Sequence, residues 1–205
     1  MDLLIPVSKE LAEHGLVVGK KIYEDKLNFR DKTQWGGSSE LQADVYGFIA
    51  EAVVCDFFNK PLPQLTRQSN DDYDVLLKGF KIDVKKVGFD KWKLKPKIWM
   101  NKKQFFRKRE KIDGFLFCTF RGGFESKKIR IDGYKGDIKI KQELKVWVPV
   151  AGKCKLLLAG WIKTEDVEAN SKTTLLKDKD GNVKDELLTV KEESLLDVKE
   201  LMENA

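Results

Sequence analysis

The segment that most constrains the fold is residues 72–89, which read DYDVLLKGFKIDVKKVGF. Apolar residues alternate with polar ones through much of this segment, a pattern typical of β-strands with one buried face. Lys78-Gly79 lies at its middle and is a candidate tight turn, so the pattern predicts a β-hairpin. A hairpin centred on this turn places Asp74 directly opposite Asp83.

Alternation also predicts which side chains share a face of the hairpin. Asp83 and Lys85 are two positions apart and project to the same side, and Asp74 projects there too. Opposed carboxylates on a sheet lie roughly 5 Å apart at Cβ and repel each other. A divalent cation with oxygen ligands, such as Mg²⁺, relieves that repulsion. Lys85 would then lie beside the cation, where an ammonium can orient or help deprotonate a water molecule or stabilise developing charge.

Such a site supplies what the hydrolysis of a phosphodiester bond requires, namely a Lewis acid, an activated water and charge neutralisation. We therefore expect Asp74, Asp83 and Lys85 to form a metal-dependent catalytic site with Mg²⁺ as cofactor and Mn²⁺ as a substitute. A plainer interpretation stays open, in which these residues form a solvent-exposed face of an edge hairpin and Lys85 pairs with Asp83.

Two helices are predicted before the hairpin. Residues 8–27 form the first, with Ser8 as its cap, and the second begins at Ser39 and carries a wide apolar stripe. Glu51 lies at the margin of that stripe, so its carboxylate would lean toward the sheet that the helix covers. We expect Glu51 to supply a third metal ligand, or to hold a water molecule or a second metal ion.

After the hairpin, further strands and helices follow without an internal repeat or a clear linker. The predicted elements are a strand at 98–100, a helix from 102, strands at 114–120, 144–150 and 155–162, a short helix at 164–169 capped by Thr164, a turn at Gly122-Gly123, and a hairpin around Asp180-Gly181 before a short acidic helix. The order favours one α/β domain over residues 1–205, with a mixed sheet flanked by helices. Its core is expected at about 8–166, with a C-terminal hairpin and short helix as an appendage at about 167–205.

The charge of the chain is polarised. The formal net charge is +6, with basic residues dominating from Lys85 to Lys111 and acidic residues frequent from Glu165 onward. Aromatic residues are interleaved with the basic ones, which suits phosphate contacts and base stacking. A solvated helix with its aromatic side chains in the core would give the same pattern. The candidate nucleic-acid-binding residues are Arg67, Lys86, Lys102, Lys103, Gln104 and Arg107.

Composition excludes several other kinds of chemistry. His14 is the only histidine, which excludes zinc sites with two histidine ligands and HNH-type nucleases. The cysteines Cys55, Cys118 and Cys154 lie far apart in apolar contexts, which predicts free core thiols and a reducing cytoplasmic environment. No apolar run is long enough to span a membrane, and the N-terminal residues lack the pattern of a signal peptide.

The candidate catalytic residues resemble those of the PD-(D/E)XK nuclease superfamily, which includes type II restriction enzymes, Holliday-junction resolvases and phage exonucleases. The likeness rests on Glu51 in the sequence GFIAEAVV, on Asp74 and on Asp83-Val84-Lys85. It extends to a later GWI-x-x-x-D segment, as in small phage and prophage members, and covers most of residues 8–166. Tyr73 stands where many members have proline.

The resemblance implies a restriction-endonuclease-like fold and a Mg²⁺-dependent nuclease that acts on DNA. By position, it makes Glu51, Asp74 and Asp83 the metal ligands and Lys85 the lysine that assists the attacking water. Related enzymes often act as dimers, so a homodimer is implied as well. Because no separate specificity domain is evident, we expect structure-directed or nonspecific cleavage.

Two other functions stay open at the level of sequence. The chain could be a nucleic-acid-binding module that keeps this fold and its basic surface without catalysis. It could also be a protein-interaction domain of a phage or mobile element. The sequence leaves open whether the substrate is DNA or RNA, and whether ends, junctions or specific sites are cut.

Overall fold

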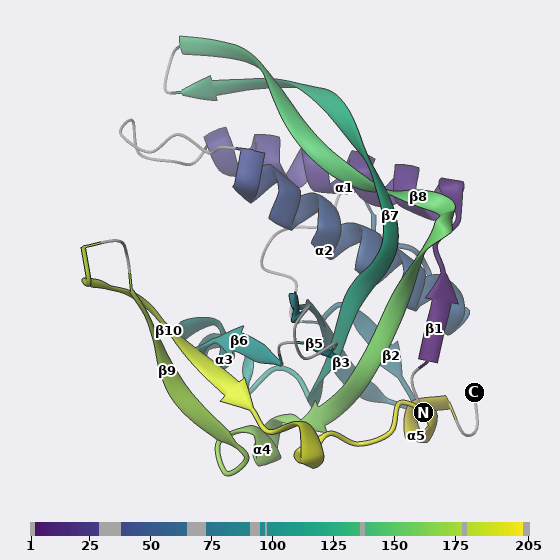
Figure 1. The fold of residues 1–205 in the computed structure, drawn as a ribbon, viewed down its shortest axis with the longest axis vertical. Coiled ribbons are helices and arrows are strands. Elements are labelled where there is room, and N and C mark those ends of the chain that lie inside the picture. Colours follow the sequence, from purple (N-terminus) through teal and green to yellow (C-terminus); the bar gives the residue numbers. More distant parts are fainter. Residues whose placement is uncertain are drawn as a thin grey trace. The chain divides into compact units, whose positions relative to one another are not determined.

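The computed structural model describes residues 3–28, 38–64, 73–90, 95–96, 98–135, 138–177 and 180–202 (Figure 1). The chain divides into two compact units, which we name the helical unit and the hairpin unit. The helical unit comprises residues 4–71 and 120–156, and the hairpin unit comprises residues 1–3, 72–119 and 157–205. The single domain expected from the sequence stays a prediction.

Two long helices of the helical unit, α1 (Lys9–Asn28) and α2 (Ser38–Phe57), confirm the predicted pair. The Ser8 hydroxyl accepts a hydrogen bond from the backbone N–H of Leu11 at 3.2 Å, so Ser8 caps α1 as expected. Gly15 of α1 allows close packing on α2, because a Cβ at this position would lie 2.5 Å from Ile49 Cα. The helices therefore touch backbone to backbone along part of their length.

Helix α2 also packs on the strands of its own unit. The Tyr46 ring lies 5.5 Å from the Phe120 ring, centroid to centroid. The Gln42 side-chain amide accepts a hydrogen bond from the backbone N–H of Trp147 at 2.6 Å and donates one to its carbonyl at 2.8 Å. Gln42 thereby satisfies both backbone groups of one strand residue, as a neighbouring strand would.

Two long strands, β7 (Gly114–Lys135) and β8 (Ile138–Lys163), contribute residues to both units. They correct three predictions, because the separate strands expected at 144–150 and 155–162 are one strand and Gly122-Gly123 is not a turn. Gly122 has φ +127°, and a Cβ there would lie 2.1 Å from the Lys153 carbonyl oxygen. Glycine is therefore required at Gly122 because two backbone segments approach closely within the sheet. In the sequence, this requirement looks the same as that of a turn.

The predicted hairpin is present as β2 (Val75–Leu77) and β3 (Phe80–Lys86). Leu77 pairs with Phe80 and Val75 with Ile82, so the register is the one expected from a turn at Lys78-Gly79. On its other side β3 runs parallel to β7. The resulting mixed five-stranded sheet has the order β1-β8-β7-β3-β2, where β1 is Leu3–Pro6, so β3 is an inner strand.

The connection from β3 to β7 contains three short strands and one helix. These are β4 (Phe89–Asp90), β5 (Lys95–Pro96), β6 (Trp99–Asn101) and α3 (Lys102–Lys108). Asn101 caps α3, because its side-chain oxygen accepts a hydrogen bond from the Gln104 N–H at 3.1 Å. The strand near 98–100 and the helix from 102 are therefore confirmed.

The C-terminal residues add two short helices, a hairpin and a 3₁₀ turn. In chain order these are α4 (Thr164–Val167), β9 (Ser171–Lys177), β10 (Val183–Val190), η1 (Glu192–Ser194) and α5 (Lys199–Met202). The predicted short helix is confirmed, but its predicted cap is wrong. The Thr164 hydroxyl donates to the Ile112 carbonyl at 3.0 Å, and no side chain caps α4.

The C-terminal hairpin is confirmed, and it is more than an appendage. Strand β10 pairs with both β9 and β6, which gives a three-stranded sheet with the order β6-β10-β9 (Figure 1). Leu188 and Val190 of β10 are buried in one cluster with Phe105 of α3 and Phe115 of β7. Residues far apart in the sequence thus contribute to this core cluster of the hairpin unit.

Other expectations concern composition. Cys55, Cys118 and Cys154 are free and buried, as predicted. Within the described ranges, no helix is both long and apolar enough to cross a membrane. The structure is of the mixed α/β class with a mixed sheet, as expected from the order of elements.

Candidate catalytic site

Asp83 lies in the interior of the hairpin unit, with 1% of its surface exposed. It lies on the inner strand β3, which pairs with β7 at this position, Asp83 being in register with Phe115. Both carboxylate oxygens have cationic partners: Lys85 Nζ lies 2.5 Å from Oδ2, and Lys108 Nζ contacts Oδ1. A buried carboxylate bound by two ammonium groups is a costly arrangement that requires such compensation.

The charge of Asp83 follows from two opposing effects. Burial acts to raise the pKa of this carboxyl group, whereas the charges of Lys85 and Lys108 and their hydrogen bonds lower it. The lysines prevail, so the pKa of Asp83 is below its ordinary value and the group is ionised at neutral pH. The site therefore presents a buried negative charge with two cations beside it.

Asp74 lies at the start of the hairpin, immediately before β2. Its Oδ2 accepts a hydrogen bond from the backbone N–H of Val84 at 2.6 Å, and its own N–H donates to the Ile82 carbonyl at 2.9 Å. Because β2 begins only at Val75, its backbone does not pair with Val84. The Asp74 carboxylate therefore accepts the hydrogen bond that a strand carbonyl would otherwise accept from Val84. Val84 is the residue that follows Asp83 on β3.

Lys85 is partly buried, and its Nζ also lies 5.9 Å from the centroid of the Phe115 ring. The expectation that it shares a face with Asp83 is consistent with their direct ion pair. The alternative of a solvent-exposed edge hairpin is wrong for Asp83, which is buried on an inner strand. The pairing of Lys85 with Asp83, which that alternative also included, is present.

Lys108 was not among the predicted site residues. It lies on α3, three residues after Phe105, and side chains three apart share one face of a helix. Phe105 is buried, with its ring 5.9 Å from that of Phe115, so this face points into the core. A sequence signal therefore existed, namely a lysine one turn after an aromatic residue that faces the sheet. We name Asp83, Lys85 and Lys108 the Asp83 cluster. That the Asp74 carboxylate shares their face of the hairpin stays a prediction.

Glu51 lies on α2 in the helical unit and is 5% exposed. Its neighbours Ala50 and Ala52 are also buried. Because Glu51 and Asp83 belong to different units, the role of Glu51 as a third ligand stays a prediction. Over the described residues, no group of three or more His, Cys, Asp or Glu side chains is gathered closely enough to hold a metal ion.

The predicted nucleic-acid-binding residues have different surroundings. Arg67 lies outside the described residues. Lys86 is partly buried, and burial lowers the pKa of its ammonium group. Lys102 binds Glu186 with an Nζ–Oε2 distance of 2.8 Å. The side chains that remain exposed are those of Lys103, Gln104 and Arg107.

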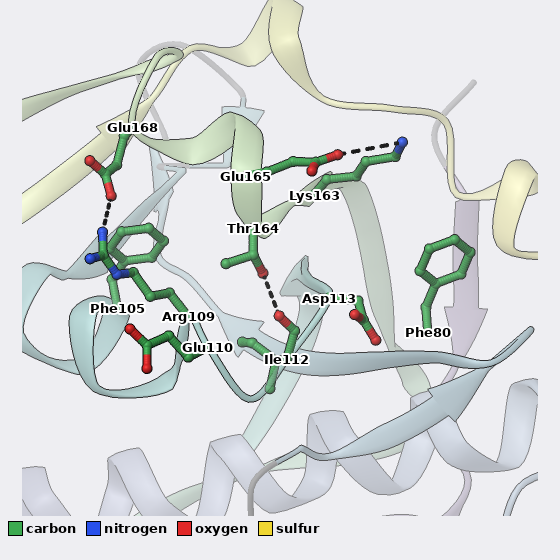
Figure 2. Close-up of a pocket in the computed structure, with 10 residues that line it drawn as sticks. All are labelled: Phe80, Phe105, Arg109, Glu110, Ile112, Asp113, Lys163, Thr164, Glu165 and Glu168. Carbon is green, nitrogen blue, oxygen red and sulfur yellow. Dashed lines mark hydrogen bonds and ion pairs between the residues drawn. The ribbon is translucent and has the colours of Figure 1, made fainter.

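A cavity of about 590 Å³ lies elsewhere in the hairpin unit (Figure 2). The residues that line it are Phe80, Phe105, Arg109, Glu110, Ile112, Asp113, Lys163, Thr164, Glu165 and Glu168. None of them belongs to the Asp83 cluster. Figure 2 shows two cations of the lining already paired, Arg109 with Glu168 and Lys163 with Glu165. With four carboxylates and two cations, this cavity repels a phosphate group.

Comparisons of the chain with protein-family models, with curated proteins and with solved structures gave no match. The family resemblance therefore rests on the residues of the sequence alone.

Proposed function

We propose that the protein is a metal-dependent nuclease that hydrolyses phosphodiester bonds through the Asp83 cluster, with DNA as its substrate. The observation that carries the proposal is the buried, ionised Asp83 with a lysine on each carboxylate oxygen. Buried carboxylates with a shifted pKa and specific charged partners are frequent at catalytic sites. The sequence pattern around Asp83, with its resemblance to the PD-(D/E)XK superfamily, supports the same conclusion.

The donor set fits a divalent cation in its chemistry. Asp74 and Asp83 offer oxygen ligands only, and Mg²⁺ typically takes one or two carboxylates and fills its other positions with water and phosphate. The lowered pKa keeps Asp83 in the ionised form that a metal ion requires. When bound, the cation supplies Lewis acidity and positive charge. Asp74, Asp83 and, by the family pattern, Glu51 would hold it, and Mn²⁺ can substitute for Mg²⁺.

The two lysines and Asp74 each have a role in this proposal. Lys85 is fixed beside Asp83 by the 2.5 Å contact with Oδ2, where its ammonium stabilises negative charge on a phosphate or positions a water molecule. Lys108, on α3, binds Oδ1 of Asp83 and balances the charge of this carboxylate when no metal ion is present. Asp74 is kept in position by its hydrogen bond from Val84.

The proposal is tested by a cleavage panel of linear, nicked, branched and single-stranded DNA, with Mg²⁺ or Mn²⁺ against EDTA. We expect metal-dependent cleavage that falls roughly 100-fold or more in Asp83→Asn and in Lys85→Met, the scale of losing one transition-state contact. Lys81→Met is the matched control, because Lys81 is an exposed lysine on the same strand and should retain activity. Circular dichroism and thermal unfolding distinguish lost catalysis from lost folding. Absence of cleavage under all conditions, or full activity in Lys85→Met, refutes the proposal.

A second function has one specific observation in its favour. Both oxygens of Asp83 are engaged by lysines, so the ion pairs are complete without a metal ion. This favours a non-catalytic nucleic-acid-binding module in which the cluster serves stability. Persistent DNA binding without cleavage would identify this function, and absence of both would favour a protein-interaction domain.

A further inference from the structure

A second cavity, of about 510 Å³, lies between α3 and the beginning of β10. Its lining residues are Lys102, Lys103, Phe106, Val183, Lys184, Asp185 and Glu186, all of them in the hairpin unit. We name it the Phe106 groove. None of its lining residues belongs to the Asp83 cluster or to the cavity of Figure 2.

The two walls of the groove are joined by polar contacts. Lys102 on α3 binds Glu186 on β10, and the Asn101 side-chain amide donates a hydrogen bond to Asp185. Strand pairing reinforces the connection, because Asn101 of β6 is in register with Leu187 of β10. Both carboxylates of the groove are therefore engaged in the framework that holds its walls together.

The remaining cations of the groove point to an anionic ligand. Lys103 and Lys184 are exposed, and the described structure gives neither of them an ion-pair partner. Three lysines line the groove against two carboxylates, and one of these lysines is already neutralised by Glu186. Two unpaired ammonium groups on opposite walls provide contacts for two phosphate groups.

The aromatic ring of the groove is exposed yet fixed. Phe106 is 42% exposed, and its ring makes an edge contact with Phe105 at 5.1 Å between centroids. The Arg109 guanidinium lies 4.7 Å from the Phe106 centroid and is itself bound by Glu168. A ring held from two sides can receive a flat ligand with little loss of side-chain freedom. Lys103 lies three residues before Phe106, on the same face of α3.

We propose that the Phe106 groove binds an unpaired nucleotide of a nucleic-acid strand. Its base stacks on Phe106, and the adjacent phosphates bind Lys103 and Lys184. Base faces are covered by their neighbours inside a duplex, so this mode selects single strands, frayed ends or branches. The choice of nucleic acid as partner rests on the proposed function. The proposal deepens that function by naming the kind of substrate.

Binding is measured by fluorescence anisotropy of a labelled 20-nucleotide oligothymidylate and of a duplex of equal length, with the full chain in EDTA. We expect the single strand to bind more tightly than the duplex. Phe106→Ala should weaken single-strand binding roughly tenfold, the scale of one stacked base. Trp147→Ala is the matched control, because Trp147 is 49% exposed and has Lys145 Nζ 5.4 Å from its ring centroid, but lies in the helical unit.

The lysines are tested through the salt dependence of the same binding. Log affinity falls as log salt concentration rises. In the double variant Lys103→Ala/Lys184→Ala this fall should be less steep, the slope being smaller in magnitude by about 1.4 for two lost contacts to a single strand. Lys9→Ala/Lys128→Ala removes the same charge from two exposed lysines of the helical unit and should leave the slope nearly unchanged.

Each outcome decides between the hypotheses. Equal affinity for single strand and duplex, no effect of Phe106→Ala, or an equal loss in Trp147→Ala overturns the groove proposal. So does competition by polyglutamate as effective as that by unlabelled oligothymidylate, which would identify an acidic protein as the ligand. Because EDTA prevents cleavage, binding and nuclease activity are measured separately. If the unsubstituted protein cleaves DNA under Mg²⁺ but does not bind the single strand in EDTA, only the groove proposal is refuted. Intact binding without any cleavage under Mg²⁺ refutes only the nuclease.

Discussion

Replacement of Lys108 by methionine removes one of the two cations that neutralise the buried Asp83. Methionine is unbranched and apolar, so it can fill much of the space of the lysine stem while lacking the ammonium group. The variant leaves Lys85 on Oδ2 and deprives Oδ1 of its donor. Because Asp83 is 1% exposed, little water is available to replace that donor.

The expected loss of stability follows from these contacts. A hydrogen bond to a charged group contributes about 1.5–3 kcal/mol. Removing the sole partner of a buried charge costs about 3–5 kcal/mol. Since Lys85 remains, we expect a loss of about 2 kcal/mol, which for a chain of 205 residues corresponds to a decrease in Tm of roughly 4–8 °C.

Urea unfolding at pH 7 measures the effect, with Lys103→Met on the exposed face of α3 as the matched control. The control should change the free energy of unfolding by less than about 0.5 kcal/mol. In the double variant Asp83→Asn/Lys108→Met, the buried charge is gone, so the loss should be smaller than the sum of the two single losses. Equal stability of Lys108→Met and its control, or strict additivity in the double variant, would contradict the assigned ion pair.

Three further predictions concern pH, backbone and thiols. Since the folded pKa of Asp83 is lowered, its stabilisation is fully present above the unfolded value of about 4 and is lost as pH falls through the folded value. The difference in unfolding free energy between wild type and Asp83→Asn should therefore narrow below about pH 4, and a constant difference down to pH 2 would argue against it. Gly122→Ala should destabilise by about 3 kcal/mol or more in urea unfolding, because its Cβ would meet the Lys153 carbonyl, whereas Gly47→Ala in α2 should be neutral or slightly stabilising. Burial raises the pKa of the Cys118 thiol to about 12, so a disulfide reagent at pH 8 should modify it only after unfolding, and rapid labelling of the native protein would disprove its burial.

The local parts of the candidate site could be predicted from the sequence. The period of two along residues 73–86 and the turn at Lys78-Gly79 suffice to define the hairpin register and the common face of Asp83 and Lys85. These features depend only on neighbouring residues, and each position reinforces the same alternation. The two long helices could be predicted for a similar reason, since their caps and apolar stripes are local.

The rest depends on contacts that a linear pattern does not contain. The burial of Asp83 follows from the pairing of β3 with β7, and Lys108 reaches it only because α3 packs its Phe105 face on the sheet. The register alone predicts Asp74 opposite Asp83, whereas in the structure its carboxylate binds the Val84 N–H, which the short β2 does not reach. The sequence predicts a turn at Gly122, because a close approach of two backbones and a reversal of the chain both require glycine.

The pairing of β10 with β6 also has a consequence for how the chain acquires its fold during synthesis. Leu188 is in register with Met100, and Val190 completes the cluster that contains Phe115. At about 5–20 residues per second, the ribosome needs roughly 4–15 s to proceed from residue 115 to residue 190. Throughout this interval the nascent hairpin unit lacks part of its core, and α3, which carries Lys108, has no β10 to pack against. The Asp83 cluster is therefore expected to mature late, after the hairpin that contains most of it has emerged.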